Sequence, residues 1–118
     1  MRLVSLIMLL VFIACNIAGE SSNEILKQVS NGEGEKAILF TKYGGSTVSN
    51  STQVSILEEN EQLSDRQTGN IFTCNQSDVV KMQWLSADTL EISYDKNIQT
   101  YIKEEKMNGI SVVYKIVE

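Results

Sequence analysis

The chain has no histidine, no proline and only two cysteines among its 118 residues. Without histidine it lacks the side chain that titrates nearest to neutral pH and the commonest ligand for transition metals. A serine–histidine–aspartate triad is excluded for the same reason, and two cysteines are too few for a zinc framework. We therefore expect no catalytic residues, no cofactor and no metal site, although acid–base chemistry by paired carboxylates stays open.

Basic residues are also scarce, with ten Lys and Arg against fifteen Asp and Glu and a net charge of −5. A domain this acidic repels the phosphates of DNA and RNA. The basic residues between Lys103 and Lys106 are interrupted by Glu104 and Glu105, so no local run offsets the repulsion. The composition predicts a protein that does not bind nucleic acid.

The longest hydrophobic run lies at the N-terminus, where Arg2 precedes an almost wholly apolar segment at residues 3–14. A positive start followed by a short apolar segment is typical of a secretory signal peptide. The segment is too short for a transmembrane helix, which needs about 20 apolar residues. We interpret residues 1–19 as an export signal and the beginning of a tether.

The apolar segment ends at Ala14 and Cys15, which resemble the lipobox of bacterial lipoproteins. That resemblance implies a lipid anchor on Cys15 and a place in the bacterial cell envelope, facing the periplasm or the exterior. Phe12 and Ile13 depart from the residues usual in such a site. Ordinary cleavage after Ala18 or Gly19 is the alternative, and it would give a soluble secreted protein.

Residues 20–35 are interpreted as a tether that holds a possible short helix at residues 22–30. Ser22 is a suitable N-cap, and Ile25, Leu26 and Val29 fall on one face of such a helix. Once Cys15 is lipidated or removed, Cys74 is the one cysteine left, and its apolar neighbours predict that it is buried.

Residues 36–118 alternate between apolar and polar positions as β-strands do. The sequence Asn108-Gly109 favours a type I′ hairpin turn, which needs positive φ at both positions. We predict a mainly β, monomeric domain, an antiparallel meander folded into a sandwich or open barrel, with Trp84 in its core. The seven strands expected are 37–43, 52–58, 71–74, 80–85, 90–94, 100–107 and 110–117.

Two loops are the candidate binding sites, because binding residues tend to lie on loops that a rigid scaffold holds. The first is uncharged and rich in glycine and hydroxyl groups. The second is acidic and would steer a basic partner toward the domain. Its carboxylates could alternatively serve a hydrolase, or both loops could be solvated turns. The candidate residues are Gly44, Gly45, Ser46 and Thr47 in the first loop, and Glu58, Glu59, Glu61 and Asp65 in the second.

Several short motifs resemble a group of small bacterial envelope proteins with no assigned activity. They are Ser-Thr-Gln-Val-Ser-Ile-Leu at 51–57, Gly-Asn-Ile-Phe at 69–72 and the stretch from Trp84 to Tyr94 with its alternating Asp-x-Leu-x-Ile-x-Tyr. The resemblance implies an exported, small, β-rich domain and supplies no catalytic residue. Members often carry a cysteine where this chain has Tyr43.

We therefore expect a non-enzymatic binding module, anchored to a membrane through Cys15, with a basic protein as its candidate partner. The first alternative is an immunity-like or inhibitor-like protein that neutralises a basic toxin or enzyme. The second alternative is a hydrolase that uses carboxylates.

Overall fold

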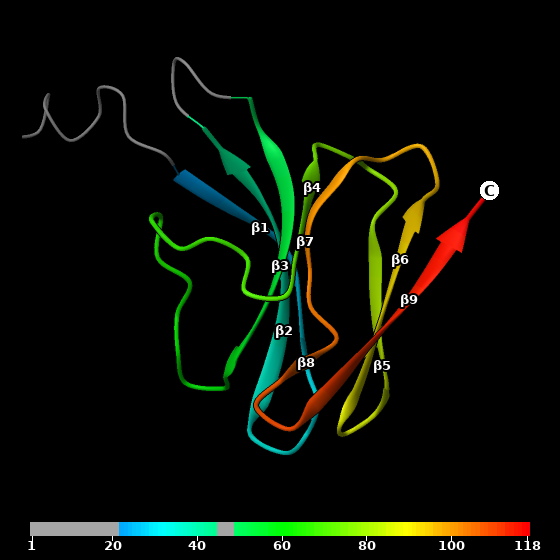
Figure 1. Ribbon diagram of the computed structural model, residues 1–118. Helices are drawn as coiled ribbons and strands as arrows, with labels where there is room; N and C mark the ends of the chain where they lie inside the picture. Colours follow the sequence, from blue (N-terminus) through cyan, green and yellow to red (C-terminus); the bar gives the residue numbers. More distant parts are fainter. Residues whose placement is uncertain (1–21, 45–48) are drawn as a thin grey trace, which may run out of the picture.

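The computed structural model describes residues 22–44 and 49–118, and every regular element in these ranges is a β-strand (Figure 1). The export signal, Cys15, Gly45, Ser46 and Thr47 lie outside the described residues. The strands are β1 (Ser22–Ser30), β2 (Glu35–Tyr43), β3 (Ser51–Glu58), β4 (Phe72–Asn75), β5 (Lys81–Ser86), β6 (Thr89–Asp95), β7 (Thr100–Lys103), β8 (Lys106–Met107) and β9 (Ile110–Val117).

The strands form two sheets that pack face to face as a sandwich (Figure 1). Sheet A has the order β1-β2-β3-β4-β7, and sheet B has the order β5-β6-β9-β8. The predicted mainly β fold is confirmed. The prediction of a simple antiparallel meander is wrong in two places. β4 pairs with β7 instead of with β5, and β6 pairs in parallel with β9 through the whole of β6.

Residues 22–30 form a strand, so the predicted short helix is wrong. An isolated helix of nine residues is marginal in water, whereas β1 pairs antiparallel with β2 from Ser22 opposite Tyr43 to Ser30 opposite Lys36. A bulge falls between Ile25 and Lys27. The β domain therefore includes residues 22–30, which the sequence assigned to the tether.

The predicted strand 100–107 is divided between the two sheets. Its first half, β7, pairs with β4 in sheet A, and its second half, β8, pairs with the start of β9 in sheet B. At the crossing the N–H of Glu104 donates to the carbonyl of Ile71, while the carbonyl of Glu105 accepts from the N–H of Val112. The predicted turn that follows is confirmed, since Asn108 and Gly109 have φ of 50° and 83°.

Strands β2 and β3 are buried on both faces. Their inner face joins the main core between the sheets, where Leu39 and Val54 lie with Leu90 and Ile92 of sheet B. On the outer face a second, smaller cluster consists of Ile38, Phe40 and Leu57, and Leu63 packs against it from the segment 59–70. That segment is a surface loop, as expected from its charged and polar residues, and it also covers part of the outer face of sheet A.

Hydrogen bonds hold the segment 59–70 down. The side-chain amide of Asn23 donates to the carbonyls of Ser64 and Gln67 at 2.7 and 3.0 Å. Gln53, which is buried, accepts from the N–H of Gly69 at 2.6 Å. A Cβ on Gly69 would lie 2.7 Å from the carbonyl oxygen of Phe72 and 2.9 Å from that of Val54, so only glycine fits there.

Trp84 and Cys74 both belong to the interior, to different degrees. Trp84 is half-buried at the edge of the core, and its Nε1 donates to the carbonyl of Val29 at 2.8 Å, which links β5 to β1. Cys74 is fully buried, as predicted. Burial raises the pKa of its thiol to about 11, against a smaller opposite effect of a hydrogen bond from the Thr52 backbone.

Candidate functional site

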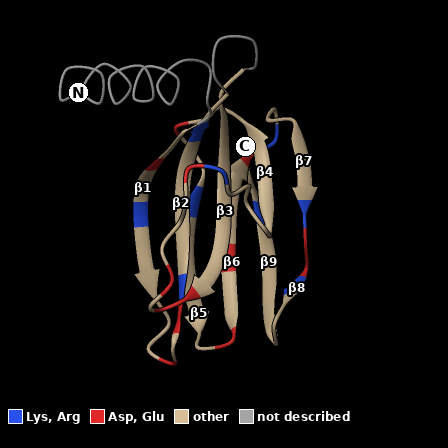
Figure 2. Cartoon of the chain, turned by 90° about the vertical axis from the view of Figure 1, so that its left-hand side faces the viewer, with Lys and Arg blue, Asp and Glu red and all other residues tan. Residues whose placement is uncertain are grey.

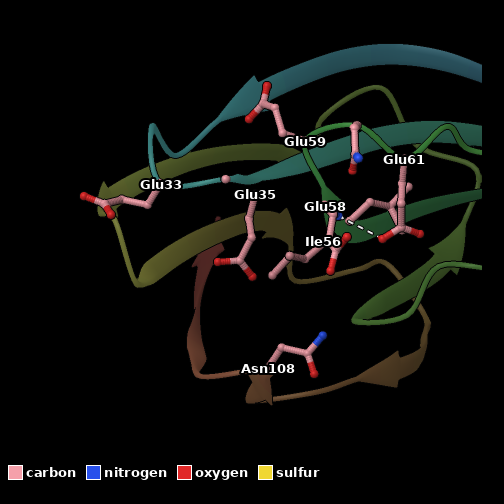
Figure 3. A pocket seen from close by; sticks show the side chains of 10 residues that line it. Glu33, Glu35, Ile56, Glu58, Glu59, Glu61 and Asn108 are labelled. Carbon is pink, nitrogen blue, oxygen red and sulfur yellow. Dashed lines mark hydrogen bonds between the residues drawn. The ribbon is translucent and has the colours of Figure 1, made fainter.

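A pocket of about 700 Å³ lies at the end of the sandwich where β2 begins, β3 ends and β8 turns into β9 (Figure 3). Five of its lining residues are glutamates, and the amide side chain of Asn108 stands on the other side. We call it the acidic pocket, with Glu33, Glu35, Glu58, Glu59, Glu61 and Asn108 as its polar residues. Ile56 contributes an apolar side chain to the wall.

The turn between β1 and β2 builds one side of the acidic pocket. The side chain of Asn31 accepts from the N–H groups of Glu33 and Glu35 at 2.8 and 3.1 Å. Gly34 has φ of 95°, a backbone conformation that glycine adopts readily. The carbonyl of Gly34 accepts from the N–H of Glu59 at 2.8 Å, which joins the turn to the segment after β3.

Two glutamates of the pocket face each other directly. Glu35 and Glu58 are paired residues in the β2–β3 ladder. Figure 3 shows both side chains pointing toward Asn108 across the pocket. Like charges directly opposite in a sheet destabilise it. Within the described part of the chain, neither carboxylate forms an ion pair with a cation.

Other glutamates of the pocket hold the backbone in place. Glu61 accepts from the N–H of Glu58 at 3.1 Å, drawn as the dashed line in Figure 3. Glu59 accepts from the hydroxyl of Ser30 at 2.7 Å. Two carboxylates thus fix the loops, and the carboxylates of Glu33, Glu35 and Glu58 are left to contact a ligand in the pocket.

The structure places the candidate residues of the second loop in two separate regions. Glu58, Glu59 and Glu61 line the acidic pocket, whereas Asp65 lies toward the other end of the sandwich and accepts from the N–H of Asn23 at 3.1 Å. In the first loop Gly44 donates its N–H to the side chain of Asn50 at 3.3 Å, also far from the pocket. The two predicted loops therefore do not form one site.

Sequence reasoning missed Glu33, Glu35 and Asn108. They come from two turns that are distant in sequence, and the sandwich brings those turns to one end. The sequence did contain a signal for Glu35. It is the first residue of β2, and a hairpin of β2 and β3 places the first residue of β2 opposite the last residue of β3. Nothing in the local sequence around Asn108 indicated that its turn reaches the same place.

The described residues offer no evident metal centre and no membrane-spanning helix. No group of three or more Asp, Glu or Cys among them could hold a metal ion. In the part of the chain that the structure describes, no helix is long and apolar enough to cross a membrane.

No family model, no curated protein and no solved structure matches this chain. The resemblance to small bacterial envelope proteins therefore stays a prediction.

Proposed function

We propose that this protein is a non-enzymatic binding module of the bacterial cell envelope, tethered by a lipid on Cys15, whose acidic pocket binds a basic segment of a partner protein. The observation that carries the proposal is the opposed pair Glu35 and Glu58, which lies in a pocket and has no cationic partner among the described residues.

The opposed pair costs stability in the free protein. Cross-strand charge pairs are worth about 0.2–1 kcal/mol, and the sign is unfavourable when the charges are alike. A lysine or arginine side chain placed between the two carboxylates would turn this repulsion into attraction. Other carboxylates nearby would raise the association rate of a basic partner, an effect that weakens as salt is added.

The direction of β1 supports the tethered arrangement. Ser22 pairs with Tyr43 at one end of the sandwich, and Ser30 pairs with Lys36 beside the acidic pocket at the other end. Residues 16–21 separate Cys15 from Ser22, and the seven steps between them span about 23–25 Å at most. Figure 2 shows acidic residues around the end with the β1–β2 and β5–β6 turns, away from the start of β1. A chain anchored through Cys15 would present the pocket away from the membrane.

The same opposed pair favours a second candidate, a protein that neutralises a basic toxin or enzyme. The two candidates differ in what happens to the partner. A neutralising protein abolishes an activity of the partner when it binds, whereas an envelope binding module leaves that activity in place.

The tether is tested by the intact mass of the membrane-purified protein. A diacylglyceryl group on an N-terminal Cys15 is the expected result. A mature chain that begins at Gly19 or Glu20 without lipid would refute the tether.

The pocket is tested by placing a photo-crosslinking residue at Asn108 in cells, identifying the linked protein and measuring its association with purified variants. The double change Glu35→Gln with Glu58→Gln should slow association at low salt about tenfold. The matched control, Glu104→Gln with Glu105→Gln, removes the same charge outside the pocket and should change the rate less than about threefold. Equal effects of the two pairs, or a linked partner that is acidic, would contradict the proposal.

A further inference from the structure

The second half of β9 has one main-chain edge without a partner strand. The N–H of Ser111 donates to the carbonyl of Asp88, and the carbonyl of Val117 accepts from the N–H of Lys96, so the odd-numbered residues of β9 direct their main-chain groups toward β6. The N–H of Val112 donates to Glu105 on the opposite side. Because main-chain direction alternates along a strand, Tyr114 and Ile116 also point to that side, where β8 no longer runs.

This gap results from the division of the β7–β8 strand between the sheets. β8 covers only Ile110 and Ser111, and the preceding residues pass into sheet A as β7 (Figure 1). No strand formed by residues 22–44 or 49–118 therefore lies beside Tyr114 and Ile116 in sheet B. Two N–H and two C=O groups, of Tyr114 and Ile116, face it, with no hydrogen bond from the described residues.

The other sheet edges in the described ranges are blunted. β1 carries a bulge between Ile25 and Lys27, and β5 carries one between Trp84 and Ser86. β7 has four residues with a bulge in its pairing, and β8 has two residues. Bulges and short strands are the means by which proteins prevent pairing at an open edge. β9 has no register shift from Ser111 to Val117, so its open half keeps the regular geometry that a further strand needs.

The side chains around the open edge are apolar and exposed. Ile116 is 56% exposed, Val117 47% and Val113 40%, although all three are large aliphatic residues. Lys115 lies between them and forms no ion pair within the described residues. A regular free edge flanked by aliphatic side chains and one unpaired cation is the kind of surface to which an extended peptide adds as a strand.

We propose that the edge of β9 at Tyr114–Val117 binds an extended segment of a partner protein, which adds to sheet B as a further strand and places an acidic residue opposite Lys115. This surface is separate from the acidic pocket and does not depend on the tether. The main-chain groups of Tyr114 and Ile116 supply the affinity, and Lys115 with its aliphatic neighbours supplies the selectivity.

A second copy of this chain fits the edge poorly. The antiparallel register that satisfies all the free groups of both copies pairs Tyr114 with Ile116 of the other copy, and it sets the two Lys115 side chains directly opposite each other. Like charges in that position are destabilising. Each copy also carries a net charge of −5, so the whole chains repel one another. Charge complementarity therefore selects a partner segment with an acidic residue.

The test uses the full chain labelled with ¹⁵N and a synthetic heptapeptide, acetyl-Thr-Val-Thr-Glu-Thr-Val-Thr-amide, at up to millimolar concentration. Chemical shifts should move along β9, and the amide exchange of Tyr114 and Ile116 should slow at least tenfold in the presence of the peptide. In an antiparallel orientation with the glutamate opposite Lys115, the main-chain N–H groups of the third and fifth peptide residues face β9. The peptide with N-methyl groups on these two residues should bind at least tenfold more weakly than the isomer methylated on its second and sixth. A peptide with lysine in place of glutamate should also bind more weakly.

Two variants separate the edge from the fold. Ile116→Pro removes the outward N–H without touching the ladder to β6, since proline is tolerated at an edge position whose N–H faces solvent. It should reduce peptide affinity at least tenfold, while Ile116→Val, which keeps the N–H, should stay within threefold. Unchanged Trp84 fluorescence shows that both variants fold. Absence of any shift at β9, equal binding of the two methylated isomers, or a concentration-dependent dimer in place of peptide binding would overturn the proposal.

Discussion

The outer face of sheet A lies beneath the segment 59–70, whereas the outer face of sheet B has no comparable cover within the described residues. Phe40 is fully buried on the outer face of sheet A, and Val113 is 40% exposed on the outer face of sheet B. The difference shows that a polar, acidic segment can close a hydrophobic face when one apolar side chain, Leu63, and several hydrogen bonds hold it there. It also leaves sheet B and the ends of the sandwich as the surfaces on which we propose that partners bind.

The largest expected effect comes from Phe40→Ala. Replacing a fully buried phenylalanine with alanine costs about 3–5 kcal/mol in the free energy of unfolding. The segment 59–70, which we call the cover, keeps Phe40 out of water on the outer face, so this cost applies to it as to a core residue. The matched change on sheet B, Val113→Ala, should cost less than about 1 kcal/mol because that side chain is already partly in water. Urea unfolding curves measure both values. Similar costs at the two positions would remove the contrast between the faces.

A smaller effect is expected for Gly69→Ala. The new methyl group would lie within 3 Å of two carbonyl oxygens and of the Gln53 side chain, so the backbone must shift. Such overpacking costs about 1–3 kcal/mol. Gly32→Ala is the control, because its Cβ meets nothing within 4 Å and its cost of about 1 kcal/mol arises only from the positive φ. A Gly69→Ala protein as stable as the wild type would show that the cover is not seated as described.

Asn23→Ala should loosen the cover with a cost of about 1–2 kcal/mol, because the carbonyls of Ser64 and Gln67 lose their donor. Faster amide exchange in residues 64–69 is the specific sign of this change. Asn97→Ala is the control at an exposed asparagine, and it should leave the exchange in that segment unchanged. A loss of stability without faster exchange in residues 64–69 would assign Asn23 a different role.

An effect that is absent near neutral pH concerns the thiol of Cys74. Burial raises its pKa to about 11 in the folded protein, from about 9 in the unfolded chain. The unfolded state therefore loses the proton first, and stability that is complete below pH 9 declines as the pH rises toward 11. Cys74→Ala should show a shallower decline over this interval in thermal unfolding experiments. The same decline in both proteins would mean that other groups cause it.

Much of sheet B was predictable from the sequence because its strands are buried on one face. The alternation of Leu90, Ile92 and Tyr94 with polar residues, and the Asn108-Gly109 turn, each carry the necessary information locally. β1 was not predictable in the same way. Most of its side chains are exposed, so its sequence shows neither the period of a helix nor that of a strand clearly. Pairing with β2 decides its conformation.

The cover and the acidic pocket depend on contacts between segments distant in sequence. The sequence singled out the glutamates at the end of β3 and after it as candidates, but the polar composition of the segment 59–70 indicated a solvated loop. The packing of Leu63 against the cluster of Ile38, Phe40 and Leu57, with the hydrogen bonds to Asn23, shows that the segment lies on a sheet. Glu33 and Asn108 join the pocket through turns that the sandwich brings together. Local patterns do not encode such convergence, which needs the strand register and the packing of the sheets.

The most direct test of the contrast between the two sheets is residue-resolved amide hydrogen exchange on the full chain. The amide of Gly69, near the end of the segment 59–70, donates to the buried side chain of Gln53 and should exchange about as slowly as core amides such as that of Leu39. Along β9, Val113 and Lys115 should be protected by β6 while Tyr114 and Ile116 exchange rapidly, which gives an alternating pattern. Fast exchange at Gly69 together with uniform protection from Val113 to Val117 would contradict both the covered face and the open edge.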